Sequence, residues 1–441
     1  MQTNNKVYFD NLLRNIHEKK FSISIIGLGY VGLPRALNFC EENIVVHGID
    51  TNKNKVNSLN TGTSYIKHIN STRISNAVSS GNLRLSTNYS PVKSVDVIIL
   101  CVPTPLNPKK EPDLSFINKT ISSIKKYLKK GQILILESTT YPGTTDEKIY
   151  PVLIELGFKI GEDFFLAYSP EREDPGNQIF ESKQIPKLLG GHTKECSEIG
   201  QKIYNITNKK VIVLSSIRTA EMTKLLENVY RAVNIGLVNE LKELTDCLDV
   251  DIDEVIKAAA TKPFGFQAFS PGPGVGGHCI PIDPYYLSWK AKDYNLDLEL
   301  IKIAGKINAS MPNFVVKKIE NILKKNKKFI KSSAVLILGL TYKKNIDDIR
   351  ESPSLEIIKL LQNKGFEIFY NDPFISIELQ NKLLTQDIKF IEINRSNLNK
   401  FDFVILVTDH DIFDYQMIKE NSKLIFDTRG KYKKSNNIVK A

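Results

Sequence analysis

The stretch that decides the fold is Ser22-Ile-Ser-Ile-Ile-Gly27-Leu28-Gly29-Tyr30-Val31-Gly32. Its apolar start predicts a buried strand, its glycines predict a tight turn, and the residues from about Val31 to Glu42 predict a helix. Strand, glycine turn and helix form a dinucleotide fingerprint, in which the helix N-terminus faces a pyrophosphate. The expected cofactor-binding residues of this turn are Gly27, Gly29, Tyr30, Val31 and Gly32.

Asp50 follows the next expected strand, Ile44 to Ile49, about 20 residues beyond the glycines. A carboxylate at this place binds the ribose hydroxyls of the adenosine and repels a 2′-phosphate, and no arginine directly follows it. We therefore expect NAD rather than NADP as the cofactor. The alternative is a structural glycine turn followed by a chance acid.

Two further expected strands end in polar residues. Val95 to Val102 precedes Pro103 and Thr104, and Ile133 to Leu136 precedes a segment with Thr139. Because the carboxyl ends of parallel strands line ligand sites, we expect these hydroxyls to face a nicotinamide or a sugar. Each segment taken singly is more often only a turn.

A charged loop, Ser169 to Asn177, follows the expected strand Phe164 to Tyr168. Glu171 in this loop is a candidate base for activating water, and Arg172 lies beside it. A solvated loop explains the same residues equally well, so the residues alone leave both interpretations open.

One long helix is predicted from about Arg218 to Leu248. Lys224 and Asn228 lie one turn apart on it, so an ammonium and an amide can point together into a site, although an exposed polar face is the default for such a pair. The apolar stripe on this helix predicts a core or a dimer seam. It consists of Leu225, Val229, Val233, Leu237, Leu241 and Leu244.

The segment from Phe264 to Pro284 is rich in Gly, Pro and aromatic residues and predicts a functional loop. It contains Cys279, whose thiolate can add to an aldehyde. The resulting thiohemiacetal still carries a hydride for a second nicotinamide, so an alcohol can become a carboxylate through a thioester. Asp283 can take part in proton transfer or orient Lys224. Neighbours in extended chain point to opposite sides, so His278 is not expected to pair with the thiol, and the spacing of a zinc site is lacking.

A helix is predicted from about Pro312 to Lys325. A second α/β layer is predicted from Val335 to Phe426, without a glycine fingerprint. Lys343 and Arg350 follow its first strand and suit phosphates of another ligand. The alternative is a structural ion pair of these residues with Asp347 or Glu351. The expected fold class is therefore α/β, with two Rossmann-like doubly wound domains joined by a central helical domain with a long helix.

Composition excludes several classes of protein. The 441 residues, 41% of them hydrophobic, predict two to four globular domains, and five scattered cysteines indicate a reducing cytosol. The net charge of +11 comes from dispersed lysines, which favours solvated faces over a nucleic-acid patch. No apolar run approaches the ~20 residues of a membrane helix, so we expect a soluble, cytoplasmic protein without a membrane partner.

From Ile23 to Gly430 the chain resembles the UDP-glucose/GDP-mannose dehydrogenase family. The stretches 137–145, 169–177, 224–239, 260–287 and 350–356 are most similar to its bacterial UDP-N-acetylglucosamine 6-dehydrogenases. The resemblance implies an NAD-binding domain (1–212), a central helical dimerisation and catalytic-loop domain (213–326) and a C-terminal UDP-sugar-binding domain (327–441). It also implies a homodimer that removes four electrons at C6 of a UDP-sugar for surface polysaccharide synthesis.

The resemblance also implies roles for individual residues. Cys279 matches the nucleophile, Lys224 and Asn228 match the stabilisers of the developing oxyanion, and Asp283 matches the loop aspartate. Lys224, Asn228 and Gly276 are expected to contact the substrate.

Glu171 matches the glutamate of thioester hydrolysis, and Thr139 matches the threonine that orders the catalytic water. Glu171 and Arg172 are further expected substrate contacts. Lys343 and Arg350 match a pair that reaches substrate and cofactor respectively.

Two departures from the family pattern and two competing functions stay open. The segment Thr261 to Phe266 lacks the arginine with which UDP-glucose enzymes reach the partner's sugar, which favours an N-acetylhexosamine over glucose. UDP-GlcNAc is expected first, with UDP-GalNAc, UDP-ManNAc and UDP-glucose as alternatives. Arg35 stands where relatives carry an apolar residue, and the sequence offers no account of it. The competing functions are a two-electron hydroxyacid-type dehydrogenase and a nucleotide-sensing protein without catalysis.

Overall fold

The chain folds into two compact units. The first comprises Met1–Glu227 with Tyr285–Leu296, and the second comprises Asn228–Pro284 with Asp297–Ala441. The computed structural model describes residues 6–67, 69–172, 184–277, 280–325, 333–376, 379 and 387–441.

An eight-stranded sheet forms the centre of the first unit, with the strand order β3-β2-β1-β4-β5-β6-β7-β8. Its first six strands have the order of a dinucleotide-binding fold and run parallel, whereas β7 pairs antiparallel with β6. The strands are β1 (Ser22–Ile26), β2 (Val45–Ile49), β3 (Leu83–Ser86), β4 (Val97–Leu100), β5 (Ile133–Leu136), β6 (Phe165–Tyr168), β7 (Lys187–Gly191) and β8 (Val211–Val213).

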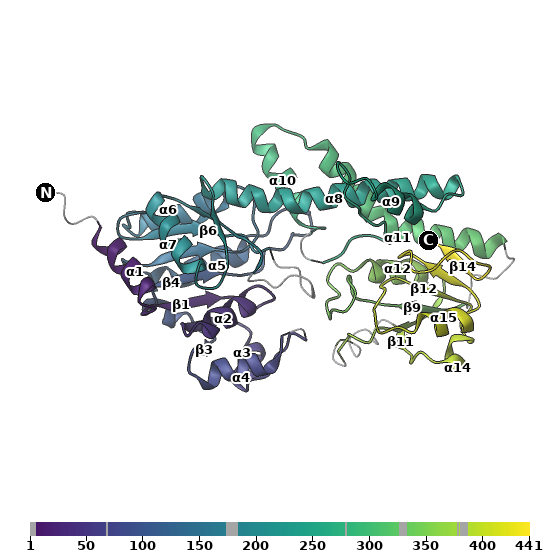
Figure 1. Cartoon of the computed structure of the whole chain (residues 1–441), viewed down its shortest axis with the longest axis horizontal. Helices are drawn as coiled ribbons and strands as arrows, with labels where there is room; N and C mark the ends of the chain where they lie inside the picture. The colour runs from purple at the N-terminus through teal and green to yellow at the C-terminus, as the bar shows by residue number, and fades with distance from the viewer. Residues whose placement is uncertain are drawn as a thin grey trace. The chain divides into compact units, whose positions relative to one another are not determined.

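Helices flank this sheet (Figure 1). One apolar core joins Phe9 of α1, Leu37 of α2 and Ile199 of α7 to Ile23 of β1, so these helices pack on one face of the sheet. The α-helices that belong wholly to this unit are α1 (Val7–His17), α2 (Gly32–Glu41), α3 (Lys53–Asn60), α4 (Ser71–Ser79), α5 (Ser115–Ile124), α6 (Tyr150–Glu155) and α7 (Lys194–Tyr204). Shorter helical turns are η1 (Ser90–Lys93), η2 (Lys125–Tyr127), the π-helical η3 (Thr145–Ile149) and η5 (Lys292–Tyr294).

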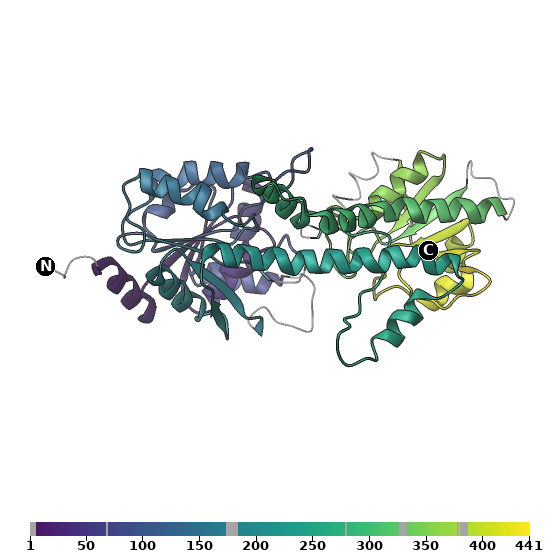
Figure 2. The same cartoon turned by 90° about the horizontal axis from the view of Figure 1, so that it is seen from above.

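Two long helices make up most of the central region of the chain. The first, α8 (Ile217–Cys247), is continuous in Figure 2 and matches the predicted long helix. The second, α11 (Glu299–Lys325), corrects a prediction, because the sequence suggested a helix start at Pro312 and this proline lies inside the helix. Met311 and Val315 on either side are buried, and their packing offsets the backbone hydrogen bond that a proline cannot make. Two shorter helices here are α9 (Ile252–Ala259) and α10 (Asp283–Ala291).

A six-stranded parallel sheet forms the centre of the second unit, with the order β11-β10-β9-β12-β13-β14. Its strands are β9 (Ala334–Leu338), β10 (Glu367–Asn371), β11 (Ile388–Phe390), β12 (Phe403–Leu406), β13 (Ile425–Asp427) and β14 (Ile438–Lys440). The helices that follow strands of this sheet are α12 (Pro353–Gln362), α14 (Arg395–Leu398) and α15 (Tyr415–Asn421). The predicted class is confirmed: two parallel-sheet α/β layers and a long helical region. None of the helices among the described residues is long and apolar enough to span a membrane.

Candidate functional site

The glycine turn after β1 is shaped by close backbone contacts. A Cβ at Gly27, whose φ is +94°, would lie 2.5 Å from the carbonyl oxygen of Cys101, and one at Gly32 would lie 1.9 Å from that of Gly27. A Cβ at Gly29 would meet no described heavy atom within 4 Å. Gly27 and Gly32 therefore serve the turn itself, while Gly29 leaves open space beside the N-terminus of α2, as a bound pyrophosphate requires.

Asp50 follows β2 and is tied to the glycine turn. Its Oδ2 accepts the backbone N–H of Leu28 at 3.0 Å, and its Oδ1 accepts that of Asn52 at 2.9 Å. Lys55 lies 3.5 Å from the same carboxylate. The carboxylate thus stands next to the turn, where the ribose of a dinucleotide fits.

The candidate residues after β4, β5 and β6 lie at one edge of the sheet, because these strands are parallel neighbours. Thr104 is buried, and its carbonyl oxygen accepts the Tyr286 hydroxyl at 2.9 Å. Thr139 is partly buried, and Pro103 is exposed. The loop after β4 is therefore held in place through Thr104.

Glu171 at the end of β6 is buried, with 8% of its surface exposed, so a solvated loop does not describe it. Its Oε2 lies 2.6 Å from Nη2 of Arg35. Burial alone would raise the pKa of Glu171, but the charges of Lys187 and Arg35 outweigh it and hold the pKa well below its ordinary value. Residues 173–183 lie outside the described part of the chain.

Both terminal nitrogens of the Arg172 guanidinium have a partner in the protein. Nη2 lies 2.7 Å from the carboxylate of Glu227 on α8, and Nη1 donates to the carbonyl of Pro186 at 2.8 Å. These contacts tie the end of β6 to α8.

On α8, Lys224 is only 7% exposed and so does not belong to a solvated face. Asn228 donates a side-chain hydrogen bond to Asp283. Two candidate site residues 55 positions apart are thus brought into direct contact. One turn before Lys224, Glu221 accepts the backbone N–H groups of Gly143 and Thr145 at 2.5 and 3.0 Å.

The loop that contains Cys279 (264–284) is described up to Gly277. The predicted nucleophile Cys279 and its neighbour His278 lie outside the described residues. Gly277 donates its N–H to the carbonyl of Arg350 at 2.9 Å. A Cβ at Gly276 would lie 2.5 Å from Cβ of Tyr342 and 2.7 Å from a backbone oxygen. The loop therefore lies so close to Tyr342 and Glu351 that only glycine fits at position 276.

Further upstream, α8 and α11 hold the same loop. Asn239 on α8 accepts the N–H of Gly272 at 3.0 Å through its side-chain oxygen. Its amide nitrogen donates to Asn308 of α11 at 2.9 Å, and both asparagines are buried.

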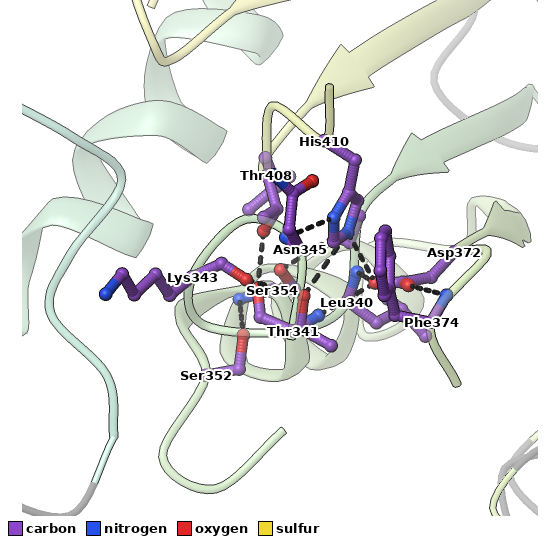
Figure 3. Close-up of polar contacts among 12 residues, drawn as sticks. Leu340, Thr341, Lys343, Asn345, Ser352, Ser354, Asp372, Phe374, Thr408 and His410 are labelled. Carbon is purple, nitrogen blue, oxygen red and sulfur yellow. Dashed lines mark hydrogen bonds and ion pairs between the residues drawn. The ribbon is translucent and has the colours of Figure 1, made fainter. Parts of the chain in front are cut away.

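A buried polar cluster organises the loop after β9 (Figure 3). Asp372 accepts the N–H groups of Leu340 and Thr341 at 2.7 and 3.0 Å and lies 3.0 Å from Nε2 of His410. Nδ1 of His410 accepts the N–H of Asn345 at 3.0 Å, which assigns the ring proton to Nε2. Burial raises the pKa of Asp372, but the hydrogen bonds from His410 and Thr341 outweigh it, so the pKa lies below its ordinary value.

Lys343 and Arg350 lie in the loop that this cluster holds. The Lys343 side chain extends away from the cluster in Figure 3. Arg350 forms a forked contact with Asp348, at 3.0 Å from Nε and 2.6 Å from Nη2. The aspartate in this pair is thus Asp348, next to the Asp347 that the sequence suggested as a structural partner.

Sequence reasoning missed several of these residues. Asp372 and His410 follow predicted strands and could have been found by their place at the carboxyl edge of the sheet. Glu221 lies among many polar helix residues, and nothing local distinguishes it. Lys187 begins β7, a strand that the sequence pattern did not reveal.

Comparisons with known proteins agree with this architecture. Three sequence models of the UDP-glucose/GDP-mannose dehydrogenase family match the chain: the NAD binding domain at residues 21–208, the central domain at 218–310 and the UDP binding domain at 336–434. A UDP-N-acetyl-D-glucosamine 6-dehydrogenase of Pseudomonas aeruginosa is 37% identical, over 82% of this chain and 84% of that protein. A UDP-N-acetyl-D-mannosamine dehydrogenase of Methanocaldococcus jannaschii is 36% identical, over 92% of each.

A solved UDP-D-ManNAc dehydrogenase structure from Pyrococcus horikoshii superposes with a TM-score of 0.83 at 30% identity, covering 94% of this chain and 96% of that one. The NAD-binding layer, the long helices and the UDP-binding layer together define an NAD-dependent nucleotide-sugar dehydrogenase. The chain belongs to the UDP-glucose/GDP-mannose dehydrogenase family.

Proposed function

We propose that the protein oxidises the C6 hydroxyl of a UDP-N-acetylhexosamine, UDP-GlcNAc first, to the uronic acid, and so supplies polysaccharide synthesis. Bound NAD supplies the hydride acceptor in two successive oxidations. Gly29 and Asp50 hold this cofactor, with Tyr30 and Val31 at the helix N-terminus and Thr104 near the nicotinamide.

In the first oxidation, Asp283 and Lys224 assist removal of the C6 hydroxyl proton through water, and hydride leaves C6. Lys224 and Asn228 stabilise the negative charge that develops on the oxygen. Cys279 captures the aldehyde as a thiohemiacetal before it escapes.

In the second oxidation, the thiohemiacetal loses a hydride and becomes a thioester on Cys279. Water then adds to the thioester carbon, the carbon–sulfur bond breaks, and the uronate leaves. Glu171 orients this water together with Thr139 through hydrogen bonding to its charged carboxylate, and the water proton passes to solvent.

The observation that carries this proposal is the contact between Asn228 and Asp283. Asp283 lies four positions after Cys279, so the bond ties the chain that leaves the cysteine to α8, next to Lys224. Before the cysteine, Gly277 is bound to Arg350, and Lys343 lies in the same loop. Short stretches of chain and these two hydrogen bonds therefore connect the expected catalytic residues to Lys343 and Arg350.

The choice of sugar rests on two observations. Thr261 to Phe266 contains no arginine, which disfavours glucose. Similar proteins include a UDP-N-acetyl-D-glucosamine 6-dehydrogenase and a UDP-N-acetyl-D-mannosamine dehydrogenase, so UDP-ManNAc is the second candidate.

We also propose a homodimer built on α8. Leu237, Leu241 and Leu244 are 52%, 38% and 53% exposed in the single chain, and their spacing places them on one helix face. An apolar face of this kind on a long helix suits a second copy of the same helix.

The test is production of NADH from NAD with UDP-GlcNAc, UDP-ManNAc, UDP-GalNAc and UDP-glucose, together with measurement of the uronate. We expect two NADH per uronate and the highest kcat/KM with UDP-GlcNAc. One NADH per substrate would indicate a two-electron dehydrogenase, and no turnover of any UDP-sugar would overturn the proposed function. A Cys279→Ser variant should make no uronate.

A further inference from the structure

Four buried charged side chains form a cluster behind the ends of β5 and β6. Arg35, Glu137, Glu171 and Lys187 have exposed fractions of 2%, 1%, 8% and 3%. Among the described residues the cluster holds two cations and two carboxylates. Since burying an unpaired charge is strongly unfavourable, such a cluster persists only when its charges are matched.

Both cations contact the same oxygen of Glu171. Nη2 of Arg35 lies 2.6 Å from Oε2, and Nζ of Lys187 lies 3.3 Å from it. Oε1 accepts the backbone N–H of Arg172 at 2.7 Å. The carboxylate is thus fixed in orientation through both of its oxygens.

Glu137 holds the two cations from the other side. Its Oε2 lies 3.2 Å from Nζ of Lys187, its Oε1 lies 3.4 Å from Nε of Arg35, and Oε1 also accepts the Tyr204 hydroxyl at 2.5 Å. Arg35 further donates to the side chain of Asn208 at 3.3 Å. Each cation therefore bridges the two carboxylates.

Among the described residues, the titratable groups of this cluster and its surroundings come from several parts of the first unit. They are Arg35 on α2, Cys101 after β4, Glu137 after β5, Lys187 on β7 and Tyr204 on α7. Burial, more than any charge, raises the pKa values of Cys101 and Tyr204 above their ordinary ranges. Both groups are therefore neutral in the working pH range, and the charged side chains of this cluster within the described part of the chain are the two cations and the two carboxylates.

We propose that Arg35 and Lys187 are positioning residues that keep Glu171 ionised and aimed at the hydrolytic water, and thereby set the acidic limit of thioester hydrolysis. This inference rests on the proposed function, in which Glu171 serves the hydrolytic step. A carboxylate between two cations is a weak base, so it acts mainly by orienting the water as a charged acceptor. This role also accounts for the presence of Arg35, which the sequence alone left unexplained.

The test compares Arg35→Met with Arg35→Lys, using the pH dependence of uronate formation and the pre-steady-state release of NADH. Removing one cation next to Glu171 raises the pKa of its carboxyl, so the acidic limb of the Arg35→Met profile should move up by about one pH unit or more. At a pH between the two limbs, Arg35→Met should therefore form uronate more slowly than the wild-type protein, by up to about tenfold. Arg35→Lys should restore the limb.

The release of NADH separates a positioning role from a structural one. Because hydride removal does not use Glu171, Arg35→Met should release two NADH per active site rapidly and then turn over slowly. A uniform loss of rate at all pH values, or a lower melting temperature with an unchanged profile, would overturn the inference. Arg35→Gln and Lys187→Gln give the same test should the methionine variant not fold. Failure of the wild-type protein to oxidise any UDP-sugar would overturn the proposed function instead, so the two failures differ.

Discussion

The side-chain amide of Asn228 donates a hydrogen bond to the carboxylate of Asp283. Because each side chain orients the other, removing either should disturb the same step. We predict that Asn228→Ala and Asp283→Ala each lower kcat by about 10²-fold or more, and that the double variant loses little beyond the worse single variant. Steady-state kinetics of all three variants provide the measurement. Asn234→Ala on the same helix is the control, since that amide donates to the Tyr230 carbonyl of its own helix. Losses that multiply in the double variant would show that the contact does not couple the two residues.

Two glycines of the cofactor turn should respond differently to alanine. A methyl group at Gly29 meets no described atom within 4 Å, so Gly29→Ala should keep the melting temperature of the protein while raising KM for NAD about tenfold or more. At Gly32 the same group would lie 1.9 Å from a backbone oxygen, so Gly32→Ala should destabilise the fold. Thermal unfolding with NAD titration measures both effects. An unchanged KM for NAD in Gly29→Ala would argue against the expected path of the pyrophosphate.

Glu221 should make the stability of the fold depend on pH. Burial raises its pKa to about 7, against hydrogen bonds from Gly143 and Thr145 that favour the charged form. A glutamate in an unfolded chain titrates near about 4.3. Between these values the folded chain binds a proton that the unfolded chain does not, so the free energy of unfolding contributed by this group falls as pH rises, by up to about 1.4 kcal/mol per pH unit.

Glu221→Gln removes this titration and should flatten the dependence of unfolding free energy on pH between about 5 and 7. Urea unfolding across this range is the measurement, and Glu240→Gln, on an exposed part of the same helix, is the matched control. Equal slopes for Glu221→Gln and the wild-type protein would contradict the prediction.

The exposed leucines of α8 should decide the oligomeric state. Changing Leu237 and Leu244 to Glu places two charges on the proposed seam, so we expect a dimer to become a monomer. Sedimentation velocity measures the mass in solution. Ile154→Glu, at a residue of α6 that is 43% exposed, should leave the mass unchanged. A wild-type protein that sediments as a monomer would rule out the proposed dimer.

Periodic sequence patterns were sufficient to predict the main elements of the fold. The strand from Ile133 to Leu136 has the predicted bounds, and the long helix differs from its prediction by one residue at each end. Both are strongly apolar or strongly periodic segments, in which local burial dictates conformation. Pro312 misled the prediction of α11 because proline favours the first turn of a helix, and only the packing around it allowed the helix to continue.

The chemical groups of the site were predicted from their residue types and positions, whereas their partners depended on tertiary contacts. The sequence named Asn228, Asp283 and Glu171 because each occupies a recognisable motif. It could not show that Asn228 contacts Asp283. Nor could it show that Glu171 contacts Arg35, 136 positions away in the sequence, and Lys187, 16 positions away. A motif consists of residues that are near one another in the sequence, so it can be recognised without a structure. Charge pairing in a buried cluster depends on distances that only the folded chain establishes.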